Sequence, residues 1–437
     1  MATLAEELPL AAVVSNDMLT STCSTCFTHK PDQTLLRCTR CRAIYYCDRN
    51  CQKKDWQDHK YECMFLEKCS PRVPVSIARL MCRIALKKSF PQAFNGRKWQ
   101  TMMDHKREIQ KDPARAEFFV CVSHVLYEFM GSEMVPKPAE LISSFGKIMI
   151  NCFTITDSTM GNVTLGEGVY VGLSAHDHSC APDCYILFDG PKAILRSSRR
   201  DVAYSTDLSI SYTDLIASTS TRQQALKRQY YFDCKCSLCA DTTRDYWGRS
   251  AFANCCSGAL CLLDPQTTSL ACYFCGTPSP LKPDDVETAN LELDMFLNKN
   301  KMGEDLTVEL ERSQKMHEKM KSILSPLNFL MADLSQRILD LASELNRRDI
   351  CIRIATEAIR AYRRYLPPGH PELTTRLLSA AQADSYKDTP TGQTLELFQE
   401  AYEAALRSHG PRHVLTSRID HLLSQYRIRL QRDLDQS

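Results

Sequence analysis

Apolar residues recur at intervals of three and four over residues 75–90 and 114–130, which is the spacing of a helix that buries one face. The stretch "GSEMVPKP" (131–138) interrupts that pattern. Short apolar runs separated by turn signals such as Asp189-Gly190 follow, and they predict strands at 170–176, 184–190, 192–198 and 207–212. We therefore expect an irregular domain of small strands after the first helices.

From about residue 285 the chain predicts repeated amphipathic helices, at 334–347, 349–366, 371–385, 393–410 and 413–430. Proline and glycine at 367–372 and 409–413 break these segments, so this part is similar to a loose tetratricopeptide-type repeat. Stacked helical pairs form a concave surface, which favours substrate selection or the binding of a partner motif. A lid with a packing role only is the competing interpretation.

Composition and charge fit a globular protein with two or three domains. The 437 residues are 43% hydrophobic and 24% charged, and the net charge of +2 provides no global attraction to nucleic acid or membrane. No uninterrupted apolar run approaches the ~18 residues of a membrane span. Glu6 and Glu7 stand where a signal peptide needs basic residues. We therefore expect the reducing cytoplasm and nucleus, where thiolates serve metals.

Metal-ligand spacing dominates residues 23–63. Two C-x2-C pairs, a C-x3-C pair and an H-x3-C pair supply eight donors, namely Cys23, Cys26, Cys38, Cys41, Cys47, Cys51, His59 and Cys63. Zinc takes four nitrogen or sulfur donors, so two ions fit, and four protein ligands for each leave no open catalytic position. The binding of structural zinc contributes about 10–16 kcal/mol of folding free energy per site. This can replace the hydrophobic core that so short a segment cannot form. Free buried cysteines are the competing interpretation.

Two further cysteine groups follow along the chain. Cys234, Cys236 and Cys239 leave a zinc site one ligand short, for which Cys180 is the natural fourth and Cys184 the alternative. The cysteines between residues 255 and 275 have two interpretations, a fourth zinc site or free thiols. Its expected ligands are Cys261, Cys272 and Cys275, with either Cys256 or Cys255. We expect Zn²⁺ at three sites and consider a fourth.

Residues 23–63 resemble a MYND zinc finger, including the ending "YYC…CQKKDW..H...C". The resemblance implies interleaved ligands: Cys23, Cys26, Cys47 and Cys51 for one ion, and Cys38, Cys41, His59 and Cys63 for the other. It also implies that the finger docks peptides. Between Arg37 and Lys60 seven basic residues face three acids, a net of 7 − 3 = +4. That charge suits DNA phosphates or an acidic partner, whereas a solvated face is the plainer interpretation.

The layout resembles the SET-and-MYND-domain (SMYD) protein lysine methyltransferases. The stretches that carry the resemblance are "INCFTI" (150–155), "LSAHDHSCAPDC" (173–184), "LSISYTD" (208–214) and "QYYFDCKCSLC" (229–239). It implies an α+β fold in which a SET-type irregular β domain is interrupted by the MYND finger and a helical insert. The implied parts are 1–22, the remnant of an N-terminal SET half; 23–63, the finger; 64–140, the helical insert; 141–214, the SET core; 215–280, the post-SET zinc segment; and 285–437, an all-α TPR-like domain.

The same resemblance implies S-adenosylmethionine as cofactor and a lysine in a protein or peptide as substrate. The residues implied to border the cofactor are Asn151, Ser174, His176, Asp177, His178, Tyr212, Phe232 and His105. Tyr212 is implied to be catalytic, because methyl transfer is an in-line displacement that needs an aligned amine and little water. Phe153 and Tyr230 would line the lysine channel; core aromatics and hydrogen-bonded turn histidines are the competing interpretations. Asp177 departs from the asparagine of the family.

A second hypothesis for the function comes from two features of the family pattern that are missing here. The first 22 residues contain no glycine, where the family has a G-x-G strand and loop that closes over the cofactor. Residues 202–208 lack the usual Gly-Glu-Glu turn. The alternative is thus a catalytically incomplete zinc adaptor that binds peptide partners in transcriptional regulation. We expect a monomer whose partners meet the finger and the helical C-terminal part, with DNA as a weaker candidate and no membrane.

Overall fold

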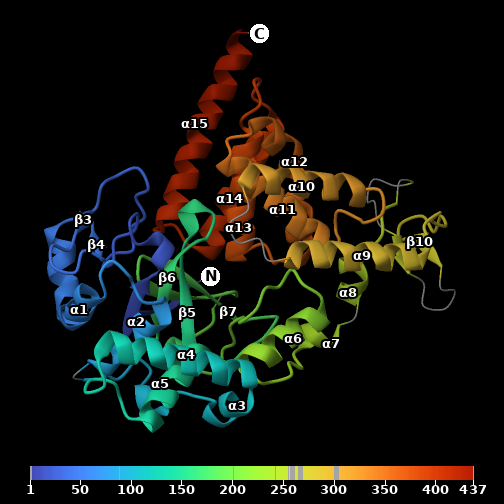
Figure 1. The fold of residues 1–437 in the computed structure, drawn as a ribbon. Helices are drawn as coiled ribbons and strands as arrows, with labels where there is room; N and C mark the ends of the chain where they lie inside the picture. Colours follow the sequence, from blue (N-terminus) through green and yellow to red (C-terminus); the bar gives the residue numbers. More distant parts are fainter. Residues whose placement is uncertain are drawn as a thin grey trace. The chain divides into compact units, whose positions relative to one another are not determined.

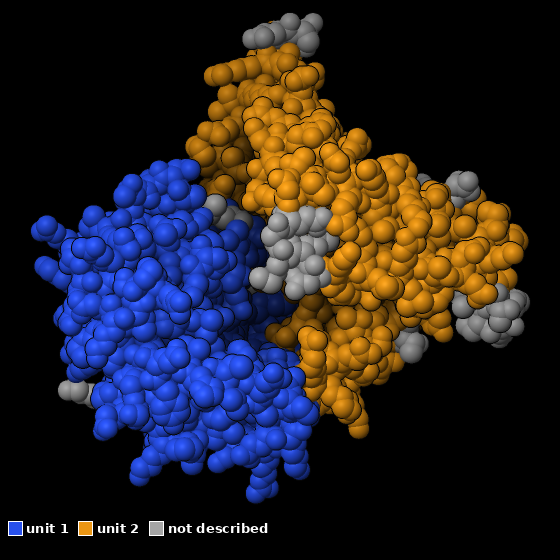
Figure 2. All heavy atoms as spheres, viewed as in Figure 1, with its two compact units in different colours: residues 1–178, 182–210, 229–231 blue, residues 179–181, 211–228, 232–437 orange. Residues whose placement is uncertain are grey.

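The computed structural model describes residues 2–87, 89–199, 201–241, 243–253, 255, 261–263, 269–299 and 305–436, and of residues 160, 261–263 and 436 it describes the backbone alone. The fold is mixed α/β (Figure 1). Two compact units make up the chain (Figure 2): residues 1–178, 182–210 and 229–231 form the first, and residues 179–181, 211–228 and 232–437 the second. Within the described ranges no helix has the length and apolar character that crossing a membrane demands.

The two larger sheets of the first unit are three-stranded and antiparallel. Their strand orders are β1-β8-β7 and β2-β6-β5. The bounds are β1 (Thr3–Glu7), β2 (Ala11–Val14), β5 (Cys152–Asp157), β6 (Val163–Val169), β7 (Cys184–Asp189) and β8 (Lys192–Ser197). All four residues of β2 are buried, so this strand lies in the core. Strands β1 and β2 precede the cysteine-rich segment, yet they pair with strands that follow it.

The cysteine-rich segment and a set of helices lie between β2 and β5 in the chain. Their bounds are β3 (Leu36–Arg37), β4 (Tyr45–Tyr46), α1 (Arg49–Cys69), α2 (Ser76–Ala85), α3 (Lys106–Lys111), α4 (Pro113–Met130) and α5 (Pro138–Asn151). Helices α4 and α5 begin with proline, whose missing N–H costs nothing in the first turn. Asp48 caps α1 by accepting a hydrogen bond from the Cys51 N–H at 2.8 Å.

A buried ion network joins α1, α2 and β2. The Arg83 guanidinium donates to Glu62 at 2.7 Å and to Asp55 at 3.1 Å, and the Arg79 guanidinium donates to Glu62 at 2.9 Å. Both arginines also donate to backbone carbonyl groups of β2, at Ala12 and Val14. These side chains are almost fully buried, so each charge depends on its partner.

The second unit contains most of the helices of the C-terminal half. Its elements are α6 (Thr219–Tyr230, of which the last two residues belong to the first unit), α7 (Ser237–Ala240), α8 (Thr243–Gly248), β9 (Cys261–Leu263), β10 (Leu270–Cys272), α9 (Pro283–Asn298), α10 (Leu306–Met320), α11 (Phe329–Glu344), α12 (Arg348–Tyr365), α13 (Pro371–Asp384), α14 (Gly392–Ser408) and α15 (Val414–Gln436). From α10 to α15 each helix packs against the next one in the chain. Buried alanines such as Ala358, Ala380 and Ala401 allow this close packing.

Two of the strands expected from the sequence do not form. Residues 170–176 begin after β6 has ended and contain the 3-10 turn Leu173–Ala175 instead of a strand. Of residues 207–212, Ile210 makes an isolated bridge with His178. Here local polar contacts replace a sheet ladder: the Ser209 hydroxyl and N–H both donate to the Asp183 carboxylate, at 2.8 and 3.1 Å.

Candidate functional site

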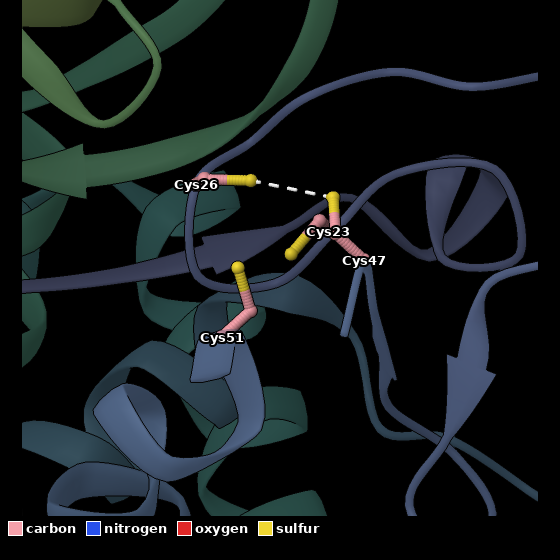
Figure 3. A group of neighbouring side chains, drawn as sticks. All are labelled: Cys23, Cys26, Cys47 and Cys51. Carbon is pink, nitrogen blue, oxygen red and sulfur yellow. Dashed lines mark hydrogen bonds between the residues drawn. The ribbon is translucent and has the colours of Figure 1, made fainter. Parts of the chain in front are cut away.

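The first donor group lies where the cysteine-rich segment enters α1. Its members are Cys23, Cys26, Cys47 and Cys51, whose sulfur atoms all lie within 4.8 Å of one another (Figure 3). Cys23 and Cys26 come from one turn, while Cys47 precedes α1 and Cys51 lies in its first turn. The sulfur atoms of Cys26 and Cys47 are 3.6 Å apart.

The second donor group is fully buried. It consists of Cys38, Cys41, His59 and Cys63, which also lie within 4.8 Å of one another. His59 and Cys63 are four residues apart on α1, so one face of the helix presents both donors. The His59 Nε2 atom lies 3.6 Å from the Cys41 sulfur, and the sulfur atoms of Cys38 and Cys63 are 3.8 Å apart. The structure thus brings the donors together in the interleaved pairs that the sequence resemblance implies.

These donor sets fit zinc. In a tetrahedral site with Zn–S bonds of about 2.3 Å, neighbouring sulfur atoms lie about 3.8 Å apart. The separations of 3.6 and 3.8 Å in the two groups match that value. Four soft donors converge in each group, which is the chemistry of a closed structural zinc site.

The third donor group belongs to the second unit. It joins Cys180 to Cys234, Cys236 and Cys239, and the sulfur atoms of Cys180 and Cys239 lie 3.6 Å apart. The alternative ligand Cys184 lies instead at the start of β7 and is not in this group. Arg222 of α6 is fully buried beside the group and donates to the Cys239 sulfur at 3.7 Å. A fixed guanidinium offsets part of the charge that several thiolates would carry.

A fourth group contains Cys255, Cys272 and Cys275, whose sulfur atoms lie within 4.8 Å of one another. Of the other expected ligands, Cys256 lies outside the described residues, and the Cys261 side chain is not described either. The part that Cys256 and Cys261 play therefore stays a prediction. Cys255, one of the two options that the sequence left open, lies beside the C-x2-C pair.

The turn from Leu173 to His178 carries four of the residues expected to border the cofactor, and all four lie in the first unit. His176 is fully buried, and its Nδ1 lies 2.8 Å from the Leu208 carbonyl oxygen, so Nδ1 carries the proton and donates. Burial lowers the pKa of His176, which favours the neutral ring. Asp177 is exposed and its carbonyl oxygen accepts from the Ile210 N–H at 2.9 Å.

Ser174 and His178 complete this turn. The Ser174 hydroxyl donates to the Val171 carbonyl at 2.9 Å, so it bonds within the turn. His178 pairs with Ile210 through the isolated parallel bridge. The turn is therefore held by the segment at 208–210, four residues or fewer before Tyr212 in the chain.

Asn151 ends α5 and holds a neighbouring segment. Its side-chain amide donates to the Met103 carbonyl at 2.9 Å and to the Lys147 carbonyl at 2.8 Å. Gly146 makes this approach possible, because a Cβ there would lie 2.0 Å from the Asp104 carbonyl oxygen. The same segment carries His105, which has a left-handed φ of 41° and a ring 5.5 Å from that of Tyr231. The expected cofactor residues Asn151 and His105 thus lie in one connected part of the first unit.

The aromatic residues expected around the lysine and the cofactor divide between the two units. In the first unit the Phe153 ring meets Tyr170 edge to face at 5.8 Å, and burial raises the pKa of Tyr230. Tyr212 and Phe232 belong to the second unit, where both are half-buried. Tyr212 lies outside any strand, so the expectation that a late strand presents it was wrong.

Comparison with known proteins agrees with this arrangement. A family model of the MYND finger matches residues 23–63. Histone-lysine N-methyltransferase SMYD3 of Homo sapiens is 32% identical over 243 residues, which cover 54% of this chain and 56% of that protein. N-lysine methyltransferase SMYD2 of Rattus norvegicus is 30% identical over 51% of each chain, and histone-lysine N-methyltransferase ASHR1 of Arabidopsis thaliana is 26% identical over 61% of this chain and 58% of that protein. The chain thus carries a MYND finger and is similar over about half its length to SET-and-MYND-domain proteins.

The chain spans a little more than half the length of these relatives. The part outside the finger contains positioning residues that sequence reasoning missed. Glu7, at the end of β1, accepts hydrogen bonds from the N–H groups of Gly172 and Leu173, each at 2.8 Å. The Asn95 amide donates to the Gly172 carbonyl at 2.9 Å and to the Tyr204 hydroxyl at 3.1 Å.

These contacts fix the entry to the turn that carries Ser174 and His176. Tyr204 also meets the His176 ring edge to face at 5.7 Å. No pattern in the sequence marks Glu7 or Asn95, because each is an isolated polar residue far along the chain from its partners. Glu7 drew attention only as evidence against a signal peptide.

Proposed function

We propose that this chain is a protein-lysine N-methyltransferase that uses S-adenosylmethionine. The observation that carries the proposal is the turn at residues 173–178, in which a neutral, fully buried His176 and the Ser174 hydroxyl are fixed by hydrogen bonds before any ligand binds. A preorganised turn costs little ordering entropy on binding. The similarity to proteins named lysine methyltransferases gives the class of reaction.

Methyl transfer depends more on the alignment of the reacting groups than on general acid–base catalysis. S-adenosylmethionine, when bound, supplies an electrophilic methyl group on a sulfonium. The lysine nitrogen forms a bond to that methyl as the carbon–sulfur bond breaks, and the amine proton leaves to solvent. In this proposal the Tyr212 hydroxyl orients the neutral amine, while Phe153 and Tyr230 exclude water from the approach.

Asp177 replaces the family asparagine in this proposal. Its carboxylate is exposed, so it can accept hydrogen bonds from the cofactor's ammonium group with an added charge attraction. It has no donor, which an asparagine amide would provide. We infer an altered affinity for the cofactor and a retained binding mode.

The domain organisation belongs to the same proposal. We infer that residues 1–22 and 141–214 form one SET domain, and the pairing of β1 with β8 and of β2 with β6 supports this inference. The finger and the helices at 64–140 would then be an insertion, residues 215–280 the post-SET segment, and residues 285–437 a TPR-like domain. The consecutive packing of α10 to α15 supports the last assignment. A monomer acting in cytoplasm and nucleus completes the proposal.

One observation favours a second function, the docking of peptides by the finger. A groove of about 230 Å³ lies beside the second donor group, and Arg37, Arg42, Arg72 and Tyr45 are among its lining residues. Three guanidinium groups beside an aromatic ring suit an acidic peptide with an apolar anchor. In an adaptor without methyltransferase activity, this groove would be the working site.

Calorimetric titration of the zinc-loaded chain with S-adenosylmethionine tests the main proposal. We expect binding in the wild type, at least tenfold weaker binding in Asn151→Ala, and unchanged binding in the control Asn298→Ala, whose amide bonds only within α9. Tyr212→Phe should bind the cofactor yet lose methyl transfer to lysine-containing proteins. If the folded, metal-loaded wild-type chain binds no cofactor, the methyltransferase proposal is wrong and the adaptor function is favoured.

A further inference from the structure

The turn at residues 271–278 in the second unit repeats the backbone of the turn at residues 22–29 in the finger. In the finger, the Phe27 N–H donates to the Cys23 carbonyl at 2.9 Å, and the Cys23 N–H donates to the Thr28 carbonyl at 3.1 Å. In the second unit, the Gly276 N–H donates to the Cys272 carbonyl at 2.9 Å, and the Cys272 N–H donates to the Thr277 carbonyl at 2.9 Å. The two turns thus have the same pair of hydrogen bonds at the same positions.

The agreement extends to the torsion angles and to the flanking residues. The residue after the second cysteine has a left-handed φ in both turns, 55° at Phe27 and 71° at Gly276. Isolated antiparallel bridges close both turns, between Thr22 and His29 and between Ala271 and Pro278. Such a turn points two sulfur atoms towards one point, which is how a C-x2-C pair shares a metal ion.

Side-chain contacts around the second cysteine also agree. The Cys26 sulfur lies 3.1 Å from the Thr28 hydroxyl, and the Cys275 sulfur lies 3.1 Å from the Thr277 hydroxyl. The third sulfur lies at the same distance in each case: 3.6 Å from Cys26 to Cys47, and 3.6 Å from Cys275 to Cys255. A disulfide would need about 2.05 Å between sulfur atoms, so these contacts are not cross-links.

We propose that Cys255, Cys272 and Cys275 hold a further zinc ion, outside the finger and outside the group around Cys180. The three sulfur atoms lie within 4.8 Å of one another, as the ligands of one ion do. This site does not depend on the proposed methyltransferase activity.

The ion would anchor the chain at the end of β10, next to two largely exposed aromatic residues. Leu270 is buried, but the residues between the two cysteines, Tyr273 and Phe274, are 54% and 58% exposed. The segment before Cys255 is fixed at Phe252, whose N–H donates to the Ile323 carbonyl at 2.8 Å. An ion shared by Cys255 and the 272–275 turn therefore ties the end of β10 to the segment that follows α10.

Exposure separates this site from the other donor groups. Cys255 and Cys275 are exposed, whereas all four donors of the group around His59 are buried. A chelator reaches exposed ligands without unfolding the chain, so the proposed ion is the first to be released.

Native mass spectrometry of the full zinc-loaded chain tests the proposal by counting metal ions. The four donor groups predict four zinc ions in the wild type, and three in Cys255→Ser and in Cys275→Ser. The matched control is Cys121→Ser, which removes an exposed cysteine outside every donor group and should retain four ions. Three ions in the wild type, or four in both test variants, would overturn the site.

Alkylation of the wild type gives a second test that needs no variant. Cys121 is exposed and should react within minutes with iodoacetamide, whereas the equally exposed Cys255 and Cys275 should react at least tenfold more slowly while metal is bound. A mild chelator should release one ion and bring these two thiols to the rate of Cys121. Equal rates for the three thiols before chelation would refute the proposal.

Discussion

The carboxylate of Glu7 accepts a hydrogen bond from the backbone N–H of Gly172 at 2.8 Å. A second bond, from the Leu173 N–H, has the same length. Burial raises the pKa of Glu7, and the two N–H donors oppose that shift by stabilising the carboxylate. The end of β1 thereby fixes the start of the turn that carries Ser174 and His176, although 165 residues separate the two bonded positions.

Replacing Glu7 should loosen this turn. In Glu7→Ala two buried N–H groups lose a charged acceptor, which costs about 1.5–3 kcal/mol. If the turn binds the cofactor, the dissociation constant for S-adenosylmethionine should rise about tenfold or more, since 1.4 kcal/mol corresponds to a factor of ten. The control is Glu6→Ala, whose carboxylate is half exposed and pairs with Lys192. Equal effects of the two variants on unfolding and binding would contradict the role of Glu7.

Gly146→Ala should destabilise the first unit. The new Cβ would lie 2.0 Å from the Asp104 carbonyl oxygen, so α5 and the segment at 103–105 must move apart. Such overpacking typically costs about 1–3 kcal/mol, which urea unfolding would measure. Gly392→Ala at the start of α14 is the matched control, because no atom lies within 4 Å of its added Cβ. If Gly146→Ala unfolds at the same urea concentration as the wild type, the segment at 103–105 can move away from α5 without a loss of stability.

Removing the Arg83 guanidinium should be far costlier than removing an exposed one. Arg83→Met leaves Asp55 without its ionic partner and Glu62 with one arginine fewer, in surroundings that exclude water. We expect a loss of about 3–5 kcal/mol in the free energy of unfolding. Arg40→Met, which breaks the half-exposed pair with Glu67, should cost under about 1 kcal/mol. Similar losses in the two variants would mean that burial does not set the strength of the network.

The cap of α13 should give the second unit a dependence on pH. The Nδ1 atom of His370 accepts a hydrogen bond from the Glu372 N–H at 3.2 Å, and burial lowers the pKa of His370 to about 4. Between this value and the ordinary 6.5, the unfolded state binds more protons than the folded state. The stability that neutral His370 contributes is therefore complete above pH 6.5 and is lost as the pH falls towards 4, by up to about 3 kcal/mol.

The variant His370→Asn isolates this effect, because asparagine caps a helix without titrating in this range. Its melting temperature relative to the wild type should rise steadily from pH 7 to pH 4. Burial raises the pKa of Glu372 to about 7, which has the opposite dependence, but this contribution is common to both proteins and cancels in the difference. A constant difference between the two proteins across that range would rule out the titration of His370.

Much of the architecture could be read from residue patterns. The spacing of donors at residues 23–63 predicts the interleaved groups, since a C-x2-C turn and an i,i+4 helical pair each present two donors to one ion. The periodicity after residue 330 predicts α11 to α15 closely. These features depend on contacts between near neighbours in the chain.

The remaining features depend on contacts between distant residues. Residues 207–212 have the composition of a strand, but Asp183 satisfies Ser209 and leaves only the bridge at Ile210. At the third donor group, the sequence leaves both Cys180 and Cys184 as candidates for the fourth ligand. Only the folded chain distinguishes them, by placing Cys180 among the other sulfur atoms.

Helix α1 contributes side chains both to the donor groups and to the buried ion network, so the finger depends on residues outside its own segment. One set of its side chains, Cys51, His59 and Cys63, belongs to the donor groups, and another, Asp55 and Glu62, pairs with arginines of α2 that also bond to β2. A finger cut out at residues 23–63 would carry two carboxylates stripped of their cations. The finger is therefore not an independent module. A recombination event that transfers it to a relative would have to transfer β2 and α2 as well.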